Sequence, residues 1–238
     1  MTSAPPEVVP YTDGRLMDVH RPTAHAEAAG PAPVVLLWHG RGPNERDVLR
    51  PLARAAADLG LLVLVPDWSS EQPDGGAAEL LASLARAHRI ATDHGGDPAR
   101  FVLAGWSLGG REAVSVATHP DTPVELRPAA AVGIASTYAD PAVTTGAAPL
   151  DHLAAAPSPV PLWLVHGTAD DIVDVEHTRK LSAAVPTAAL VELPTDHAGV
   201  VMTVYSPEAR RCLPATAADA LAAGRRTAAV LAAAAGVA

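Results

Sequence analysis

Short runs of apolar residues alternate with longer segments of helical periodicity along most of this chain. The apolar runs cover residues 16–19, 34–38, 61–65, 101–104, 129–134, 162–165 and 189–193. The helical segments cover residues 45–59, 77–92, 110–119, 175–185 and 215–231. Uninterrupted apolar runs are typical of parallel strands buried on both faces, and their alternation with helices is typical of α/β domains. We therefore predict a mostly parallel sheet of about seven or eight strands with helices on both faces, in which residues 16–19 form an edge strand.

No internal repeat and no long linker divides the 238 residues. An α/β domain of this length is ordinary. The longest irregular stretch, residues 140–161, is rich in proline and alanine and could hold a short helix, but it is too small for a lid domain. We expect one domain over residues 1–238.

The sequence Gly105-Trp106-Ser107-Leu108-Gly109 lies between the apolar run 101–104 and a helical segment. In that context G-x-S-x-G is typical of a nucleophile elbow, a sharp turn that exposes the serine hydroxyl at the carboxyl edge of a sheet. Glycines on either side leave room for the tight backbone. The pattern predicts Ser107 as a nucleophile and the backbone N–H of Leu108 as one donor to an oxyanion.

A serine nucleophile needs a base, and the base needs a partner that orients it. His197 follows the last predicted strand through a short turn, at the sheet edge where the base must lie, although an ordinary loop histidine would look the same. Asp170 and Asp171 follow the strand 162–165, and their adjacency leaves open which is the acid. Asp140 is a third and weaker candidate for the acid. We expect His166 to be structural.

The second oxyanion donor is expected from the loop after the strand 34–38, which reads His39-Gly40-Arg41-Gly42. Glycines on both sides let the backbone curl so that the N–H of Arg41 points inward. Trp106 and Trp68 are candidates for lining a substrate pocket. Packing in the core or at its rim is an equal alternative for both.

Together these motifs resemble the α/β-hydrolase superfamily, in the order serine, aspartate, histidine. The loop 39–47 resembles phospholipase/carboxylesterase and dienelactone-hydrolase-like esterases, and the elbow is similar to that of prolyl-oligopeptidase-type enzymes. The resemblance extends over residues 34–199. Its acid motif, His-Gly-x-x-Asp-x-x-Val, matches His166, Gly167, Asp170 and Val173, which implies Asp170 as the acid.

This resemblance implies an α/β-hydrolase fold and a serine esterase that works without a cofactor. Ser107 would attack a carboxylic ester, His197 would move the proton, and Asp170 would orient His197. A thioesterase or small peptidase of the same fold is one alternative, and a non-hydrolytic lyase or receptor is another. We expect no metal, because histidines and carboxylates do not cluster at ligand spacing.

A net charge of −9 argues against nucleic acid or an anionic membrane as a partner, so we expect a small-molecule ester as the ligand. Cys212 is the single cysteine, which rules out an intrachain disulfide. The first ten residues lack the features of a secretory signal, and the apolar end of the chain is too short to cross a bilayer. We therefore expect a cytoplasmic protein. The oligomeric state cannot be read from the sequence.

Overall fold

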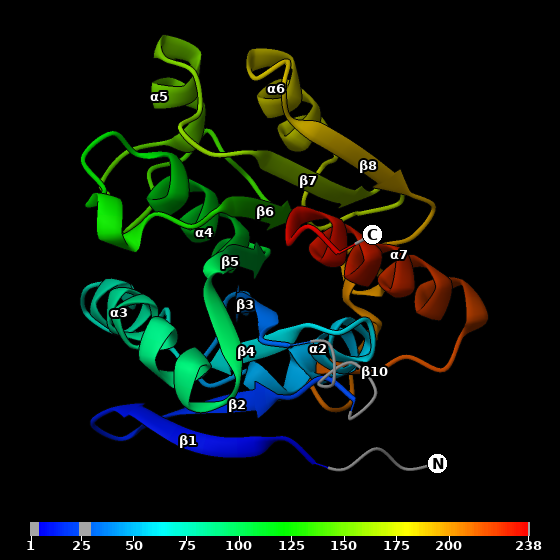
Figure 1. Ribbon diagram of the computed structural model, residues 1–238. Helices are drawn as coiled ribbons and strands as arrows, with labels where there is room; N and C mark the ends of the chain where they lie inside the picture. The colour runs from blue at the N-terminus through cyan, green and yellow to red at the C-terminus, as the bar shows by residue number, and fades with distance from the viewer. Residues whose placement is uncertain (1–4, 24–29, 238) are drawn as a thin grey trace.

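An eight-stranded sheet with the order β1-β2-β4-β3-β5-β6-β7-β8 forms the centre of the molecule (Figure 1). The computed structural model describes residues 5–23 and 30–237. The strands are β1 (Glu7–Thr12), β2 (Arg15–His20), β3 (Ala32–Trp38), β4 (Leu62–Pro66), β5 (Gly96–Trp106), β6 (Ala130–Ile134), β7 (Leu162–Gly167) and β8 (Ala189–Leu193). Only the β1–β2 and β2–β4 pairs of this sheet are antiparallel, which confirms the predicted, mostly parallel sheet.

Most strands that were predicted from continuous apolar runs are buried on both faces, whereas the edge strand β8 is mostly half-buried. Every residue of β3, β4 and β6 is buried. The prediction that residues 16–19 form an edge strand was wrong, because β1 pairs along the outer side of β2. β1 was not predicted, because most of its side chains are exposed to solvent; Val8, for example, is 47% exposed.

Helices cover both faces of the sheet. They are α2 (Arg50–Asp58), α3 (Ala77–Asp93), α4 (Leu108–Thr118), α5 (Pro149–Ala155), α6 (Glu176–Ala184) and α7 (Ala218–Ala234), with single 3-10 turns η1 (Arg46–Leu49), η2 (Val124–Leu126) and η3 (Gly199–Val201). Apolar side chains of α3, α4, α5 and α6 join one core cluster, and those of α2 and α7 join the other. Figure 1 shows α3 and α4 on one side of the sheet and α7 on the opposite side.

The helix expected over residues 45–59 is divided at its start. Residues 46–49 form the 3-10 turn η1, and α2 begins at Arg50 with a proline in its first turn. Pro51 has no backbone N–H to donate. Proline is therefore tolerated in the first turn of a helix, whereas in the helix interior it would remove a hydrogen bond. The turn η1 therefore lies between the loop after β3 and the first residue of α2.

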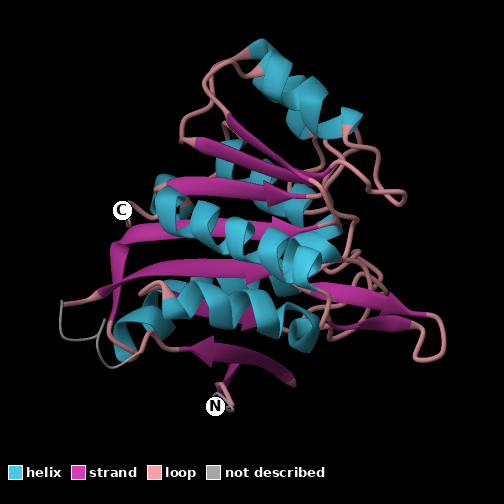
Figure 2. Cartoon of the chain, turned by 90° about the vertical axis from the view of Figure 1, so that its right-hand side faces the viewer, coloured by secondary structure: helices cyan, strands magenta, loops and turns pink. Residues whose placement is uncertain are grey.

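A two-stranded antiparallel ribbon, β9 (Thr203–Ser206) and β10 (Arg211–Pro214), was not predicted. Figure 2 shows it extending away from the main sheet. Its side chains contribute little to the core, since Tyr205 is 56% exposed, so the hydrophobic pattern carries only a weak strand signal there.

Two buried carboxylates tie loops to the sheet and helices. Asp18 of β2 is completely buried and accepts a 2.6 Å hydrogen bond from Arg46, which also pairs with Asp67 after β4. Glu112 of α4 is completely buried and accepts hydrogen bonds from the backbone of residues 143 and 144. Buried carboxylates are tolerated when they are paired or hydrogen-bonded in this way.

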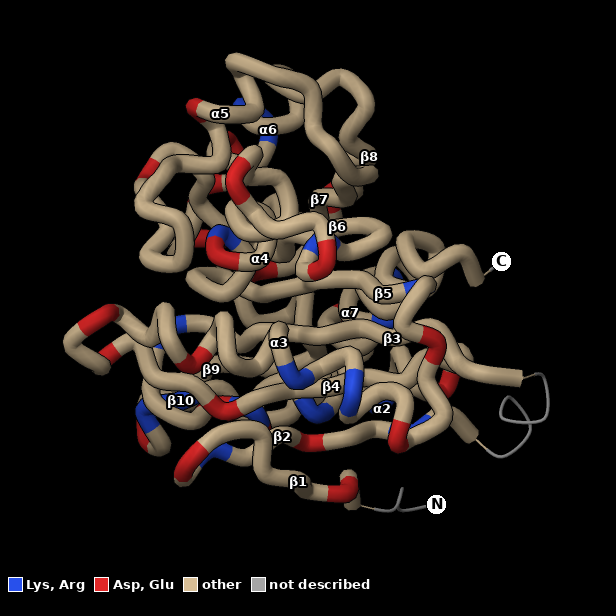
Figure 3. Tube along the Cα trace, turned by 60° about the vertical axis from the view of Figure 1, so that its left-hand side comes forward, with Lys and Arg blue, Asp and Glu red and all other residues tan. Residues whose placement is uncertain are grey.

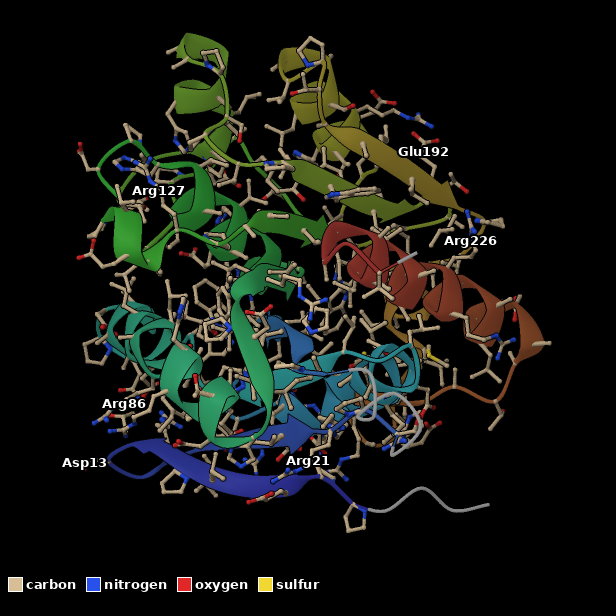
Figure 4. All side chains as sticks on the ribbon, viewed as in Figure 1. Asp13, Arg21, Arg86, Arg127, Glu192 and Arg226 are labelled. Carbon is tan, nitrogen blue, oxygen red and sulfur yellow. The ribbon has the colours of Figure 1, made fainter. Side chains whose placement is uncertain are left out.

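Charged positions elsewhere lie mostly at the surface. Figure 3 shows acidic and basic positions close together around β2 and α2. In Figure 4 the labelled charged side chains, such as Asp13, Arg86 and Glu192, lie on the outside of the molecule. Glu192 forms a 2.7 Å ion pair with Arg179 of α6, which links the last strand of the sheet to the helix before it.

Candidate active site

The predicted site residues follow the carboxyl ends of four parallel strands. Arg41 follows β3, Ser107 follows β5, Asp170 follows β7 and His197 follows β8. Parallel strands present their carboxyl ends at one edge of the sheet, where open α/β folds bind their ligands. The topology therefore brings to one edge residues that lie up to 156 positions apart in the chain, from 41 to 197.

Ser107 occupies a strained turn between β5 and α4. Its backbone has φ +54° and ψ −125°, a region that L-amino acids with a side chain rarely adopt. Two contacts from β6 and the loop after it hold the turn: Ser107 N–H donates to the carbonyl of Ile134 at 2.8 Å, and the hydroxyl of Ser136 donates to the carbonyl of Ser107 at 2.6 Å. Strained residues of this kind persist where their surroundings fix them, and they cluster at functional sites.

The two glycines that flank the serine are needed for close packing. A Cβ on Gly105 would lie 2.1 Å from the carbonyl oxygen of Gly109, and a Cβ on Gly109 would lie 2.3 Å from the carbonyl oxygen of His39. The start of α4 therefore packs directly against both β5 and the loop after β3. Any larger residue at either position would push these three backbone segments apart.

Asp170 is the carboxylate that contacts His197. Its Oδ2 accepts a 2.7 Å hydrogen bond from His197 Nδ1, while Asp171 is exposed. Asp170 Oδ1 accepts the backbone N–H groups of Ile172 and Val173 at 3.0 and 2.8 Å. Burial alone would raise the pKa of Asp170, but hydrogen bonds from His166, His197 and Val173 outweigh it and hold the pKa well below its usual range.

A second histidine lies against the same carboxylate. His166 is completely buried, and its Nε2 lies 2.8 Å from the carbonyl of Val173 and 3.2 Å from Asp170 Oδ2. Its other nitrogen, Nδ1, bonds the hydroxyl of Thr178 at 2.6 Å. The sequence prediction of a structural role for His166 missed this contact with Asp170. The available signal was the i, i+4 spacing of the two residues in the His-Gly-x-x-Asp motif.

His197 is linked by Trp106 to β5, the strand that ends directly before Ser107. Within the described residues, the hydroxyl of Ser107 makes no hydrogen bond to His197, and such bonds are often long in enzymes without substrate. The indole Nε1 of Trp106 donates to the backbone carbonyl of His197 at 3.0 Å, and the two ring centroids are 5.1 Å apart.

The loop after β3 packs against Ser107 and is organised by His39. A Cβ on Gly40 would lie 3.1 Å from the Cβ of Ser107. His39 Nδ1 donates to the carbonyl of Gly40 at 2.9 Å, and Nε2 accepts the N–H groups of Glu45 and Trp68, each at 3.3 Å. Burial lowers the pKa of His39 to about 4, so the ring is neutral near pH 7.

Both predicted oxyanion donors lie next to the contact between Gly40 and Ser107. Arg41 follows Gly40 and Leu108 follows Ser107, and within the described residues neither backbone N–H donates a hydrogen bond. The first N–H groups of a helix have no partner inside the helix, so that of Leu108 is available to a ligand. The side chain of Arg41 is exposed.

The two tryptophans predicted as pocket residues are packed inside the protein. Trp68 is completely buried and stacks on His39 with ring centroids 5.1 Å apart. Only 5% of Trp106 is exposed. The burial of Trp68 does not support its predicted contact with substrate, since its whole surface is used for packing beneath the loop. Neither tryptophan could be distinguished from a core residue by its local sequence.

Two further properties bear on the class of site. Among residues 5–23 and 30–237, no group of three or more His, Cys, Asp or Glu side chains is arranged to hold a metal ion. None of the helices described here combines the length and the apolar character needed to cross a membrane.

Comparison with known proteins defines the fold. No protein family and no curated protein matches this sequence. Solved structures do match. The butyrate-bound structure of the thermophilic esterase Est2 from Thermogutta terrifontis has a TM-score of 0.74 over 96% of this chain and 93% of that chain, at 16% identity. The propionate-bound structure has a TM-score of 0.73 over 95% and 92%, at 18% identity. The structure phosphoramylated by tabun has a TM-score of 0.74 over 96% and 94%, at 17% identity.

These similarities confirm the predicted fold. The chain has the α/β-hydrolase fold, with its mostly parallel eight-stranded sheet and helices on both faces.

Proposed function

We propose that this protein is a serine hydrolase that cleaves carboxylic esters with the catalytic triad Ser107, Asp170 and His197. The observation that carries the proposal is the hydrogen bond between His197 and a buried Asp170 at the sheet edge where the strained Ser107 turn lies. This arrangement leaves Nε2 of His197 free to accept a proton, because Nδ1 carries the hydrogen shared with Asp170.

The structural neighbours support the same chemistry. The T. terrifontis structures include propionate-bound and butyrate-bound forms, and others phosphorylated by paraoxon or phosphonylated by sarin. Propionate and butyrate are acids that hydrolysis of short-chain esters releases. By analogy, we propose short-chain esters as the first substrates to test.

The reaction follows from the positions of these groups. Ser107 Oγ attacks the ester carbonyl carbon while His197 Nε2 takes its proton, and the negative oxygen that forms accepts the N–H groups of Arg41 and Leu108. His197 then protonates the departing alcohol, which leaves an acyl group on Ser107. Water attacks this acyl-enzyme with His197 as base, releases the carboxylic acid and restores Ser107. Each oxyanion donor would contribute roughly 3–4 kcal/mol.

Labelling with a fluorophosphonate probe tests the proposal. We expect the wild-type protein to be labelled and Ser107→Ala to be unlabelled. The same substitution should lower kcat for p-nitrophenyl butyrate on the order of 10⁶-fold. Ser158→Ala, in the loop before β7, is a control that should behave as wild type. Hydrolysis retained by purified Ser107→Ala would refute the assignment.

A substrate panel addresses the alternatives within the same fold. p-Nitrophenyl esters of increasing acyl length, one aryl ester, one thioester and one peptide amide would be compared by kcat/KM. We expect carboxylic esters to be the preferred class. A higher kcat/KM for the thioester or the amide would replace the ester assignment. The single-domain organisation, the cytoplasmic location and the small-molecule ligand stay predictions.

A further inference from the structure

His197 lies on a loop that needs support beyond the triad. The loop follows β8, the last strand of the sheet, which within the described part of the chain pairs on one side only, with β7. Asp170 holds one ring nitrogen of His197, and the loop on either side is held by backbone hydrogen bonds: Ala169 N–H donates to the carbonyl of Thr195 at 3.0 Å, and Thr203 N–H donates to the carbonyl of Ala198 at 3.1 Å. The position of His197 relative to Ser107 also depends on what contacts the backbone of His197 itself.

Trp106 makes this connection. It is the last residue of β5 and directly precedes Ser107. Its Nε1 donates a buried hydrogen bond of 3.0 Å to the carbonyl of His197, which is 91 residues away in the chain. The two rings are also in contact, with centroids 5.1 Å apart and an angle of 37° between their planes. One side chain thus contacts both the backbone and the ring of His197.

Trp106 is itself held firmly. β5 pairs with β3 on one side and with β6 on the other, where Trp106 is in register with Ile134. The indole packs against the backbone of Gly40, where a Cβ would come within 3.2 Å of the ring. With 5% of its surface exposed, the indole has little room to move.

We infer that Trp106 is a positioning residue that sets the place of His197 relative to Ser107. This inference rests on the proposed function. Because Trp106 acts on the base, its loss should lower the rate of the chemical step and leave the binding of substrate nearly unchanged. A tryptophan that lined the acyl pocket would instead alter KM and the preference for acyl length.

Trp106→Phe in the full-length protein tests the inference, because it keeps an aromatic ring and removes the indole N–H. Trp38→Phe is the matched control: Trp38 of β3 is also buried, and its Nε1 donates a 3.0 Å hydrogen bond, but to Ser83 of α3. We expect Trp106→Phe to lower kcat for p-nitrophenyl butyrate about tenfold with a less than twofold change in KM. Trp38→Phe should keep kcat per folded molecule within about twofold of wild type.

Two results would overturn the inference. One is a kcat for Trp106→Phe equal to that of Trp38→Phe. The other is a change confined to KM and acyl-length preference. If Trp106→Phe does not fold, hydrogen exchange of the Trp106 indole N–H in the wild-type protein gives the answer. Slow exchange supports the buried bond, and exchange as fast as that of an exposed indole contradicts it.

The rate of fluorophosphonate labelling separates this inference from the proposed function. A wild-type protein that is not labelled contradicts the proposed function itself. Labelling of wild type and of Trp106→Phe at the same rate contradicts only the positioning role. Labelling of wild type, together with labelling of Trp106→Phe that is about tenfold slower, supports both.

Discussion

Asp170 and His197 are joined by a 2.7 Å hydrogen bond between Oδ2 and Nδ1, although they lie 27 positions apart in the chain. The neighbouring carboxylate of Asp171 points into solvent. The local backbone determines which carboxylate faces His197. The N–H groups of Ile172 and Val173 donate to the carboxylate of Asp170 and fix its orientation. Two adjacent residues of the same type are thus placed in opposite environments.

Asp170→Asn should abolish most of the activity, and Asp171→Asn should leave it nearly unchanged. An amide at position 170 can present N–H to His197 and favour the wrong tautomer of the ring. The expected loss in kcat is about 10⁴-fold by analogy with other triads. Steady-state kinetics on the two variants, which carry the same substitution one residue apart, measure this. Equal losses in both variants would contradict the assignment.

His166 should support Asp170 through its hydrogen bond. Removing that donor with His166→Phe should raise the pKa of Asp170, because one of the hydrogen bonds that favour its charged form is lost. We also expect kcat/KM to fall about tenfold, the usual scale for a hydrogen bond to a charged group. His166→Gln, which can keep a donor near this position, should lose less. A kcat/KM for His166→Phe equal to that of wild type would show that the bond has no role in the reaction.

Stability should fall as pH decreases from about 6.5 toward about 4, in part through His39. Burial lowers the pKa of His39 to about 4 in the folded protein, so across this window the unfolded chain binds a proton that the folded one does not. The full contribution is about 3 kcal/mol. Below about pH 4 both states are protonated and this histidine adds no further loss.

Urea unfolding at several pH values tests this. The free energy of unfolding of His39→Gln should change less between pH 7 and pH 4 than that of wild type. Burial also lowers the pKa of His20 to about 4, so part of the pH dependence should remain in the variant. Parallel curves for wild type and His39→Gln would contradict the prediction.

The parallel part of the fold was predictable because its strands are apolar and, apart from the edge strand β8, largely buried on both faces. The strand expected at residues 189–193 is β8 with the same bounds, and the helix expected at 77–92 differs from α3 by one residue. β1, β9 and β10 could not be predicted, since they are stabilised by pairing with a neighbouring strand while many of their side chains face solvent. Their hydrophobic patterns are accordingly weak.

The candidate site was predictable where a motif depends on local backbone geometry. The turn at Ser107 needs small neighbours, and those glycines are visible in the sequence. The choice between Asp170 and Asp171 came from a resemblance to known enzymes, since their spacing is equivalent. The contacts of Trp106 and His166 are tertiary, and no local pattern records that an indole reaches a carbonyl 91 residues away.

The positive φ of Ser107 implies a trade-off between function and stability at this position. A residue with a side chain is held there at a cost of about 1–3 kcal/mol, which glycine would avoid. Glycine normally destabilises a protein relative to alanine, and here we expect the reverse, with Ser107→Gly more stable than Ser107→Ala by about 1 kcal/mol in urea unfolding. A less stable glycine variant would contradict this. If the proposed function holds, the hydroxyl of Ser107 is needed for the reaction, and the wild-type chain keeps a less stable backbone at this position in order to carry it.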